Sequence, residues 1–333
     1  MKVLITGGAG YIGSTIATAL IEAGHAPVLL DSLVRGRREF ASGLPLYVGD
    51  VGDPQTVRRV FSEHPDIACT VHCAALAVVG ESVSDPISYY ESNVTASLRF
   101  FETLLEVGRP SVIFSSSASV YAPNETFEVT EESPLAPASP YAWTKRMTEQ
   151  MLTDVAAATA LRAISLRYFN PVGADPTGRT GPYDPRPTHV LGRMLAVAQG
   201  DLPEFVITGT DLPTPDGTGI RDYLHVWDLA RAHVAAVERF DAVLEAEGAP
   251  SAVLNLGTGS GVSVRELVDT FERVSGRPLP VREGAPRPGD AVGAYANVDK
   301  AQKLLGWRAT SSLDDALRSA IEWAGRWRAA TSA

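Results

Sequence analysis

The sequence predicts an α/β fold, a doubly wound parallel sheet with a smaller, interleaved C-terminal lobe. Three observations predict it. Strand-like apolar runs alternate with helical patterns through the first half of the chain, the first run leads into a glycine-rich turn, and Pro and Gly become frequent after residue 169. At 333 residues and 45% hydrophobic content, the chain is long enough for a sizeable core and an appended lobe.

The chain starts with a complete βαβ unit. Residues 2–6 predict a strand, residues 15–23 a helix, and residues 27–30 a second strand that ends at Asp31. Gly7, Gly10 and Gly13 follow the first strand at G-x-x-G-x-x-G spacing. Because glycine has no Cβ, this spacing permits a tight turn and close approach of a pyrophosphate to the helix N-terminus. The unit therefore predicts a dinucleotide site.

Asp31 indicates which dinucleotide binds. An acidic residue at the end of the second strand accepts hydrogen bonds from the adenine ribose. A free 2'-hydroxyl suits its carboxylate, whereas a 2'-phosphate would meet its negative charge, so NAD is favoured over NADP. Arg35, Arg37 and Arg38 lie a few residues further on and leave NADP use open.

The rest of the chain continues the alternation. Further strands are predicted at residues 46–48, 69–72, 112–115, 163–167 and 252–256, and further helices at residues 54–62, 89–105, 141–158, 264–275 and 312–327. This pattern favours a Rossmann-type dinucleotide-binding domain over residues 1–168, which also receives segments near residues 218–240. Residues 169–333 are then expected to form the substrate lobe, with Pro- and Gly-rich loops that elaborate a binding site.

Composition excludes several classes of protein. A net charge of -10 and a pI near 5.1 oppose nonspecific nucleic-acid binding. No apolar run approaches the length of a membrane span, and the first residues pass directly into a strand, so we expect a soluble, cytoplasmic protein with no membrane partner. Cys69 and Cys73 have a spacing that fits neither a disulfide framework nor a zinc site, so we expect reduced thiols and no metal.

Two further features predict proton transfer. Tyr141 and Lys145 stand four residues apart, on one face of the predicted helix, so the lysine ammonium can stabilise a phenolate that acts as a base at neutral pH. The strand at residues 112–115 runs into a series of serines at the carboxyl edge of the sheet, where ligands of open α/β folds bind. For Ser115 and Ser119 individually, hydrogen bonds to backbone at the strand end are the better interpretation. Beside a dinucleotide, these features predict hydride chemistry on an alcohol.

Five segments carry a resemblance that covers essentially the whole chain. They are T-G-G-A-G-Y-I-G at residues 6–13, V-G-E-S-V at 79–83, S-S-S-A-S-V-Y at 115–121, R-Y-F-N-P-V-G at 167–173 and D-G-T-G-I-R-D-Y-L-H-V at 216–226. Through them the chain resembles the extended short-chain dehydrogenase/reductase family and, within it, the UDP-glucose 4-epimerases.

The resemblance implies reversible C4 epimerisation of a UDP-hexose, by transient oxidation to a 4-keto sugar with tightly bound NAD. Ser117, Tyr141 and Lys145 would be the catalytic trio: Tyr141 removes the proton of the 4-hydroxyl, Ser117 hydrogen-bonds the same oxygen, and Lys145 also holds the nicotinamide ribose. The keto sugar would turn about its link to the diphosphate and take the hydride back. Family members commonly form homodimers through two helices per subunit, which residues 89–105 and 141–158 could supply.

The resemblance also implies binding residues. Asp50 would lie near the adenine. The full set of predicted cofactor-binding residues is Gly7, Gly10, Tyr11, Ile12, Gly13, Asp31, Ser32, Asp50, Val51, Ala74, Ala75, Asn93, Ser115, Tyr141, Lys145 and Tyr168. Around the substrate they are Ser117, Tyr141, Asn170, His189, Arg221, Arg287, Asp290 and Ala294. Within this set Arg221 and Arg287 would clamp the diphosphate, and Asp290 would bind the uridine ribose.

Three positions depart from the family pattern. Ala77 replaces a lysine of many members and removes a cofactor contact, and His189 takes the place of a substrate-contacting asparagine. Ala294 falls on the position that gates the size of the C2 substituent, where members restricted to plain hexoses often have tyrosine. We therefore expect UDP-GlcNAc and UDP-GalNAc to be substrates as well, although a one-residue slip to Tyr295 would reverse this expectation.

Three other functions compete with epimerisation. A nucleotide-sugar 4,6-dehydratase places an Asp-Glu pair after the serine or threonine at the sheet edge, and here those positions are Ala118 and Ser119. A non-enzymatic NAD sensor has no need of the trio. Simple oxidation with release of NADH remains a third possibility. We therefore interpret the sequence as that of an epimerase rather than a dehydratase, a sensor or a simple oxidoreductase.

Overall fold

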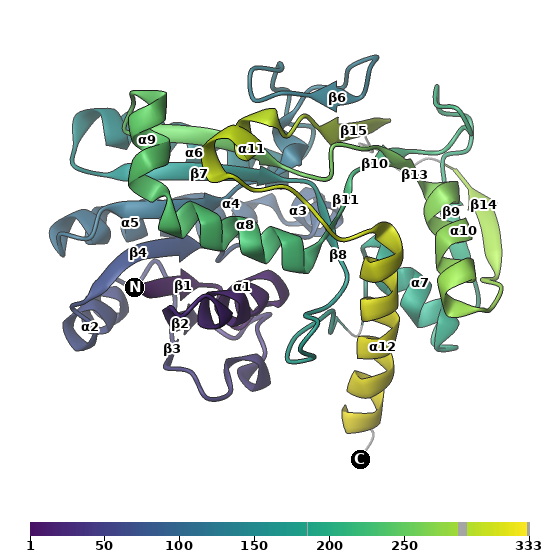
Figure 1. Cartoon of the computed structure of the whole chain (residues 1–333), viewed down its shortest axis with the longest axis horizontal. Coiled ribbons are helices and arrows are strands. Elements are labelled where there is room, and N and C mark those ends of the chain that lie inside the picture. The colour runs from purple at the N-terminus through teal and green to yellow at the C-terminus, as the bar shows by residue number, and fades with distance from the viewer. Residues whose placement is uncertain (185, 286–291, 332–333) are drawn as a thin grey trace.

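A parallel seven-stranded sheet forms the centre of the molecule (Figure 1), in a computed structural model that describes residues 1–184, 186–285 and 292–331. The strand order is β12-β7-β5-β4-β1-β2-β3. The strands are β1 (Lys2–Thr6), β2 (Ala26–Asp31), β3 (Leu46–Val48), β4 (Ile67–His72), β5 (Ser111–Ser115), β7 (Arg162–Tyr168) and β12 (Ser251–Leu256). The order runs outward in both directions from β1, so a topological switch point lies between β1 and β4, and the predicted doubly wound sheet is confirmed.

Helices cover both faces of this sheet. On one face lie α1 (Tyr11–Glu22), α8 (Val226–Glu238), α9 (Phe240–Glu247) and α11 (Asp299–Leu305). On the other lie α2 (Pro54–Glu63), α5 (Ala96–Glu106) and α6 (Pro140–Ala158). Neighbouring residues of one strand supply the two cores, since Val3 and Ile5 join the first and Leu4 joins the second. Among the residues that the structure describes, no helix is long and apolar enough to cross a membrane.

Most predicted elements of the sheet domain occur where the sequence places them, with two differences. Helix α1 begins at Tyr11, four residues earlier than predicted, directly after the glycine loop. The predicted helix 89–105 consists of α4 (Pro86–Tyr90), a π-helical turn (Glu91–Thr95) and α5. The π turn carries Asn93, whose side chain is buried.

In the part of the chain that the structure describes, the smaller lobe is built from short strands and three helices. A four-stranded sheet contains β13 (Val262–Ser263), β10 (Ile220–Arg221), β15 (Gly293–Ala296) and β6 (Glu128–Val129). Two further pairs join β11 (Tyr223–His225) to β8 (Asn170–Val172) and β14 (Val281–Gly284) to β9 (Phe205–Thr208). The helices α7 (Val190–Ala198), α10 (Val264–Ser275) and α12 (Leu313–Thr331) enclose its core.

The chain passes repeatedly between the two parts (Figure 1). After β10 and β11 in the lobe, α8, α9 and β12 return to the large sheet, α10 lies in the lobe, and α11 packs against β12 again. The lobe is therefore interleaved with the sheet domain, as the sequence predicts. The predicted division at residue 168 stays a prediction.

Two fully buried histidines make the fold sensitive to acid. His72 bonds to Thr6 Oγ1 through Nδ1 at 2.7 Å and to Ser97 Oγ through Nε2 at 2.9 Å, and His233 Nδ1 bonds to the Leu229 carbonyl at 2.9 Å. Burial lowers the pKa of His72 to about 3 and that of His233 to about 4, from 6.5. Both therefore stay neutral in the folded chain while they gain protons in the unfolded chain below pH 6.5.

We expect the two histidines to cost the fold about 4 kcal/mol of unfolding free energy between pH 7.5 and pH 5. Stability is full above pH 6.5 and is lost as the pH falls towards the folded-state pKa values. Urea denaturation at the two pH values measures the loss. In the variant His72→Gln/His233→Gln the pH dependence should become shallower by that amount, and an unchanged slope would contradict the assignment.

Candidate active site

The glycine loop between β1 and α1 is closed by backbone contacts that leave no room for side chains. Gly7 has φ +67°, and a Cβ there would lie 2.8 Å from the Ala74 nitrogen. A Cβ at Gly13 would lie 2.2 Å from the Gly7 carbonyl oxygen. Gly10 is the N-cap of α1 and offers no side-chain cap, so the helix presents its first amides and its positive dipole end at the sheet edge. This geometry suits a pyrophosphate.

Asp31 lies beside this loop at the end of β2. Its two carboxylate oxygens accept hydrogen bonds from the amides of Ala9 at 2.9 Å and Leu33 at 2.8 Å. Two of the three arginines that left NADP open have other partners: Arg35 pairs with Glu81 at 2.5 Å, and the Arg37 guanidinium lies 5.4 Å from the ring centre of Tyr183. Asp31 places its negative charge at the end of β2, at the predicted ribose position. The residues present fit NAD better than NADP.

Tyr141, Lys145 and Ser117 meet at the carboxyl edge of the sheet. Helix α6 starts one residue before Tyr141, with Pro140 in its first turn and the Ser139 hydroxyl accepting a hydrogen bond from the Ala142 amide at 3.2 Å. Tyr141 and Lys145 therefore lie one turn apart on one face, 8% and 3% exposed. Ser117 follows β5, and its hydroxyl lies close enough to the Tyr141 phenol to lower the pKa of that phenol.

Burial is the largest influence on the pKa of both Tyr141 and Lys145. Burial raises the pKa of Tyr141, and the nearby Ser117 hydroxyl lowers it in part. The lysine ammonium lies 5.8 Å from the centre of the Tyr141 ring and donates to the Ser115 carbonyl at 2.8 Å. Desolvation is the larger effect on the phenol in the protein without cofactor, so the role of Lys145 in bringing the phenol into the neutral range stays a prediction. Burial lowers the pKa of Lys145 itself to about 8, against the opposing charges of Cys73 and Glu149.

The other predicted cofactor residues lie at the carboxyl ends of the sheet strands or in the segments that follow them. Tyr11 and Ile12 open α1, Ser32 follows β2, Asp50 and Val51 follow β3, Ala74 and Ala75 follow β4, and Ser115 and Tyr168 end β5 and β7. Asn93 instead supports the wall of the site. Its side-chain oxygen accepts from the Leu76 amide at 2.8 Å, and its Nδ2 donates to the Thr144 hydroxyl at 3.1 Å. The direct cofactor contacts stay predictions.

Four of the predicted substrate residues, Asn170, His189, Arg221 and Ala294, lie in the lobe. Arg221 in β10 is paired in register with Ala294 in β15, and Asn170 begins β8. Ala294 packs beside the apolar cluster that contains Val120 and Phe169, whereas a Cβ at Gly261 would lie 3.0 Å from the ring of Tyr295, the neighbouring strand residue. Ala294 and Tyr295 therefore point to opposite faces of the strand. Arg287 and Asp290 lie outside the described residues.

His189 has a structural partner. It is the N-cap of α7, and its Nδ1 accepts a hydrogen bond from the Gly192 amide at 3.2 Å. Burial lowers its pKa, which favours the neutral ring. Its predicted substrate contact would have to use the other ring nitrogen.

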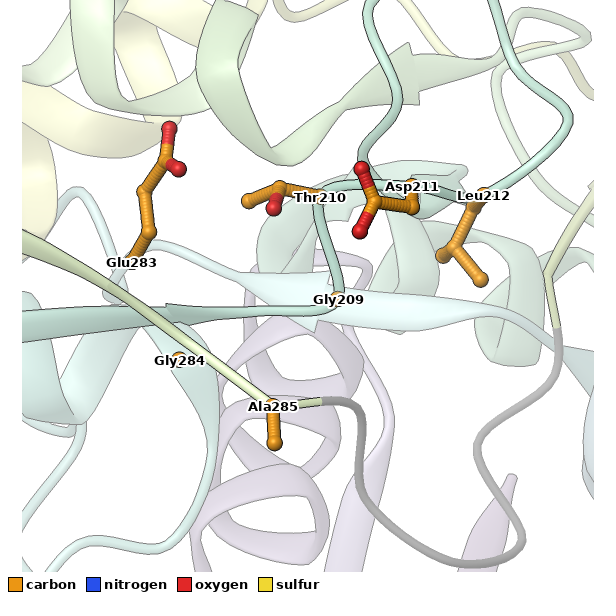
Figure 2. A pocket seen from close by; sticks show the side chains of 7 residues that line it. All are labelled: Gly209, Thr210, Asp211, Leu212, Glu283, Gly284 and Ala285. Atoms are coloured by element: carbon orange, nitrogen blue, oxygen red, sulfur yellow. The ribbon is translucent and has the colours of Figure 1, made fainter.

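A pocket in the lobe is separate from the catalytic trio. Residues Gly209 to Leu212, after β9, and Glu283 to Ala285, at the end of β14, line it, and Figure 2 shows the side chains of Asp211 and Glu283 among them. These two carboxylates disfavour an anionic diphosphate. Within the described ranges no group of three or more His, Cys, Asp or Glu residues is placed to hold a metal ion, and Cys69 and Cys73 are free thiols.

Sequence reasoning missed a buried polar network behind the trio. Glu149 and Arg167 form an ion pair at 2.7 Å, with their side chains 2% and 4% exposed, and Ser116 and Tyr121 bond to it. One signal was available: Glu149 stands four residues after Lys145, so it had to share the inward face of the same helix.

Because the predicted catalytic trio and the glycine loop lie at the same edge of a doubly wound parallel sheet, the fold and the arrangement of these residues are those of a short-chain dehydrogenase/reductase. The chain belongs to the NAD dependent epimerase/dehydratase family, whose model matches residues 3–257.

Similarity to individual proteins extends along nearly the whole chain. UDP-glucose 4-epimerase of Azospirillum brasilense is 44% identical over 324 residues, 97% of this chain and 91% of the relative. The Bacillus subtilis (strain 168) UDP-glucose 4-epimerase is 41% identical over 334 residues, 97% of this chain and 96% of the relative.

Two solved structures of UDP-glucose 4-epimerases have the same fold. The enzyme from Stenotrophomonas maltophila, with bound NAD and formylated UDP-arabinopyranose, superposes with a TM-score of 0.93 at 37% identity and 99% coverage of both chains. The enzyme from Bifidobacterium longum, in complex with NAD+ and UDP, gives a TM-score of 0.91 at 37% identity and 98% coverage of both.

Proposed function

We propose that this chain interconverts UDP-glucose and UDP-galactose by NAD-dependent epimerisation at C4. The observation that carries the proposal is the meeting of Ser117, Tyr141 and Lys145 beside the glycine loop, in a chain 44% identical to a UDP-glucose 4-epimerase over 97% of its length. The family and its relatives make it an NAD-dependent epimerase rather than a passive NAD sensor.

The glycine loop and Asp31 would hold NAD. The uncapped N-terminus of α1 would receive the pyrophosphate, and Asp31 would accept hydrogen bonds from the adenine ribose hydroxyls. Lys145 would donate to the nicotinamide ribose. Bound here, NAD supplies a positively charged acceptor that takes the hydride from C4 of the sugar and later returns it.

The protein's own residues move the proton and control the sugar. Tyr141 removes the proton of the 4-hydroxyl while Ser117 hydrogen-bonds the same oxygen, and the Lys145 ammonium favours the phenolate. Arg221, with the predicted Arg287, holds the diphosphate while the 4-keto sugar turns about its link to it. Tyr141 then returns the proton to the oxygen as the hydride arrives on the opposite face. Substrate and product have the same oxidation state.

A 4,6-dehydratase is not favoured. Elimination needs an acid and a base near C5 and C6, and the two residues after Ser117 are Ala118 and Ser119, in the short helix Ala118–Val120. The test is NMR of purified protein mixed with UDP-galactose and no added NAD. Epimerisation predicts UDP-glucose; a stable 4-keto-6-deoxy product, or NADH in stoichiometric amounts, would contradict it.

Ala294 is expected to admit an N-acetyl group at C2 of the hexose. It lies next to Arg221 across the β10 and β15 pair and packs beside the apolar cluster that contains Val120 and Phe169. We expect Ala294→Tyr to lower turnover of UDP-GalNAc by about 100-fold, since overpacking costs a few kcal/mol, and to spare UDP-galactose. Parallel kinetics on the two substrates measure this, with Ala294→Ser as control. Loss of both activities, or of neither, would count against the assignment.

We expect the helices beside the site to supply the surface of a homodimer. Exposed apolar side chains gather on α3 (Val79–Ser84), α4, α5 and α6, which contact one another: Val83, Ile87, Leu98, Trp143 and Met147 are between 43% and 70% exposed. We expect Trp143→Glu to convert a dimer into monomers in sedimentation velocity, because a charge would be buried in the interface. Lys303→Glu, on α11, is the matched control. A wild-type protein that sediments as a monomer would contradict the proposed dimer. The cytoplasmic location of the protein stays a prediction.

A further inference from the structure

A buried ion pair joins α6 to the central sheet one turn beyond Lys145. Glu149 on α6 and Arg167 on β7 make two parallel hydrogen bonds, Nε to Oε1 at 2.8 Å and Nη2 to Oε2 at 2.7 Å. Taking such a pair out of water is costly, and apolar residues of similar volume often serve stability as well. Stability alone therefore does not account for the pair. The proposed mechanism uses neither side chain directly, so the pair needs another role.

The pair holds both ends of one loop. The Ser116 hydroxyl donates to Glu149 Oε1 at 2.5 Å. At the other end, Arg167 Nη1 donates to the Tyr121 hydroxyl at 3.0 Å, and that hydroxyl donates to Asn255 Oδ1 at 2.6 Å. We call residues 116–121 the serine loop. Ser117 lies inside it.

We propose that the Glu149 and Arg167 pair positions Ser117 against Tyr141. This inference rests on the proposed function. Helix α6 carries Tyr141, Lys145 and Glu149, so the ion pair ties the helix with the proton acceptor to the loop with its hydrogen-bond partner. Backbone bonds from the Ser116 amide to the carbonyls of Phe114 and Leu166, at 3.0 and 2.9 Å, anchor the start of the loop to the sheet and do not link it to α6. Glu149 and Arg167 are positioning residues that act through Ser116 and Tyr121.

The milder variants at the ends of the loop test this best. Glu149→Gln leaves an uncompensated buried guanidinium and is expected to fold poorly, so it cannot separate positioning from stability. Ser116→Ala and Tyr121→Phe each remove one hydroxyl that is hydrogen-bonded to the ion pair, and both leave the charges of Glu149 and Arg167 in place. Asp228→Asn is the matched control, because it weakens another buried carboxylate, which accepts from the amides of Thr310 and Ser311, outside the site.

A double-mutant cycle between Ser116 and Ser117 is the measurement. For UDP-galactose we expect Ser116→Ala to lower kcat about tenfold with little change in KM, since small misplacements of catalytic groups carry penalties of this order. In the Ser117→Ala background the same change should have no further effect on kcat, because no hydroxyl remains to be positioned. Tyr121→Phe should show the same coupling to Ser117, and Asp228→Asn should lower stability and leave kcat unchanged.

The outcomes are distinct. A kcat for Ser116→Ala equal to that of the wild type, or equal losses with and without Ser117, would overturn the positioning role while leaving the proposed function intact. Absence of wild-type turnover of UDP-galactose would overturn both. Strong coupling at Ser116 and Tyr121, with none between Asp228 and Ser117, supports the inference.

Discussion

Tyr141→Phe is expected to lower kcat for UDP-galactose by about 1,000-fold, the contribution of a positioned general base. The phenylalanine ring fills the same buried space in the first turn of α6, so only the proton-accepting oxygen is lost. Steady-state kinetics with UDP-galactose measure the effect.

As a control, the thermal stability and the NAD content of the Tyr141→Phe variant are measured. Because Lys145 donates to the Ser115 carbonyl and not to the phenol, the lysine should keep its place, and bound NAD and thermal stability should match the wild type. A kcat within about tenfold of the wild type would be too small an effect for a general base and would remove Tyr141 from the mechanism.

Gly13→Ala is expected to have the second large effect, on NAD binding. The new Cβ would lie 2.2 Å from the Gly7 carbonyl oxygen and 2.9 Å from its carbonyl carbon, so the loop that cradles the pyrophosphate must move. Overpacking of this kind costs about 3 kcal/mol, which corresponds to roughly 100-fold weaker NAD binding. Titration calorimetry with NAD on protein stripped of cofactor measures the change.

Gly325→Ala is the matched control for that change. Gly325 lies within α12, and a Cβ there would meet no atom within 4 Å. We expect it to leave NAD affinity unchanged and to stabilise the helix by about 0.5–1 kcal/mol. Equal NAD affinity of Gly13→Ala and Gly325→Ala would show that the glycine loop does not cradle the cofactor.

The parts of the molecule that were predictable depend on short-range pattern. The βαβ unit from Lys2 to Asp31 is local, so apolar runs, glycine spacing and one acidic residue were sufficient to predict it. The i,i+4 relation of Tyr141 and Lys145 likewise follows from helix geometry alone. Motifs of this kind depend only on residues close in sequence, so they can be predicted without knowing how the rest of the chain folds.

Long-range packing decided the features that the sequence did not predict. The return of β12 to the edge of the large sheet, beside β7, depends on contacts between segments about ninety residues apart. The Glu149 and Arg167 pair, and the raised pKa of Tyr141, depend on burial that only the folded chain creates. The two faces of β15, which separate Ala294 from Tyr295, follow from strand pairing.

The central claim is that hydride leaves C4 and returns to C4 within one site. UDP-galactose deuterated at C4, incubated with the enzyme in ordinary water, tests it directly when the product is followed by NMR. The account predicts UDP-glucose that retains deuterium at C4, because Tyr141 exchanges only the hydroxyl proton. UDP-glucose with hydrogen from water at C4 would contradict it.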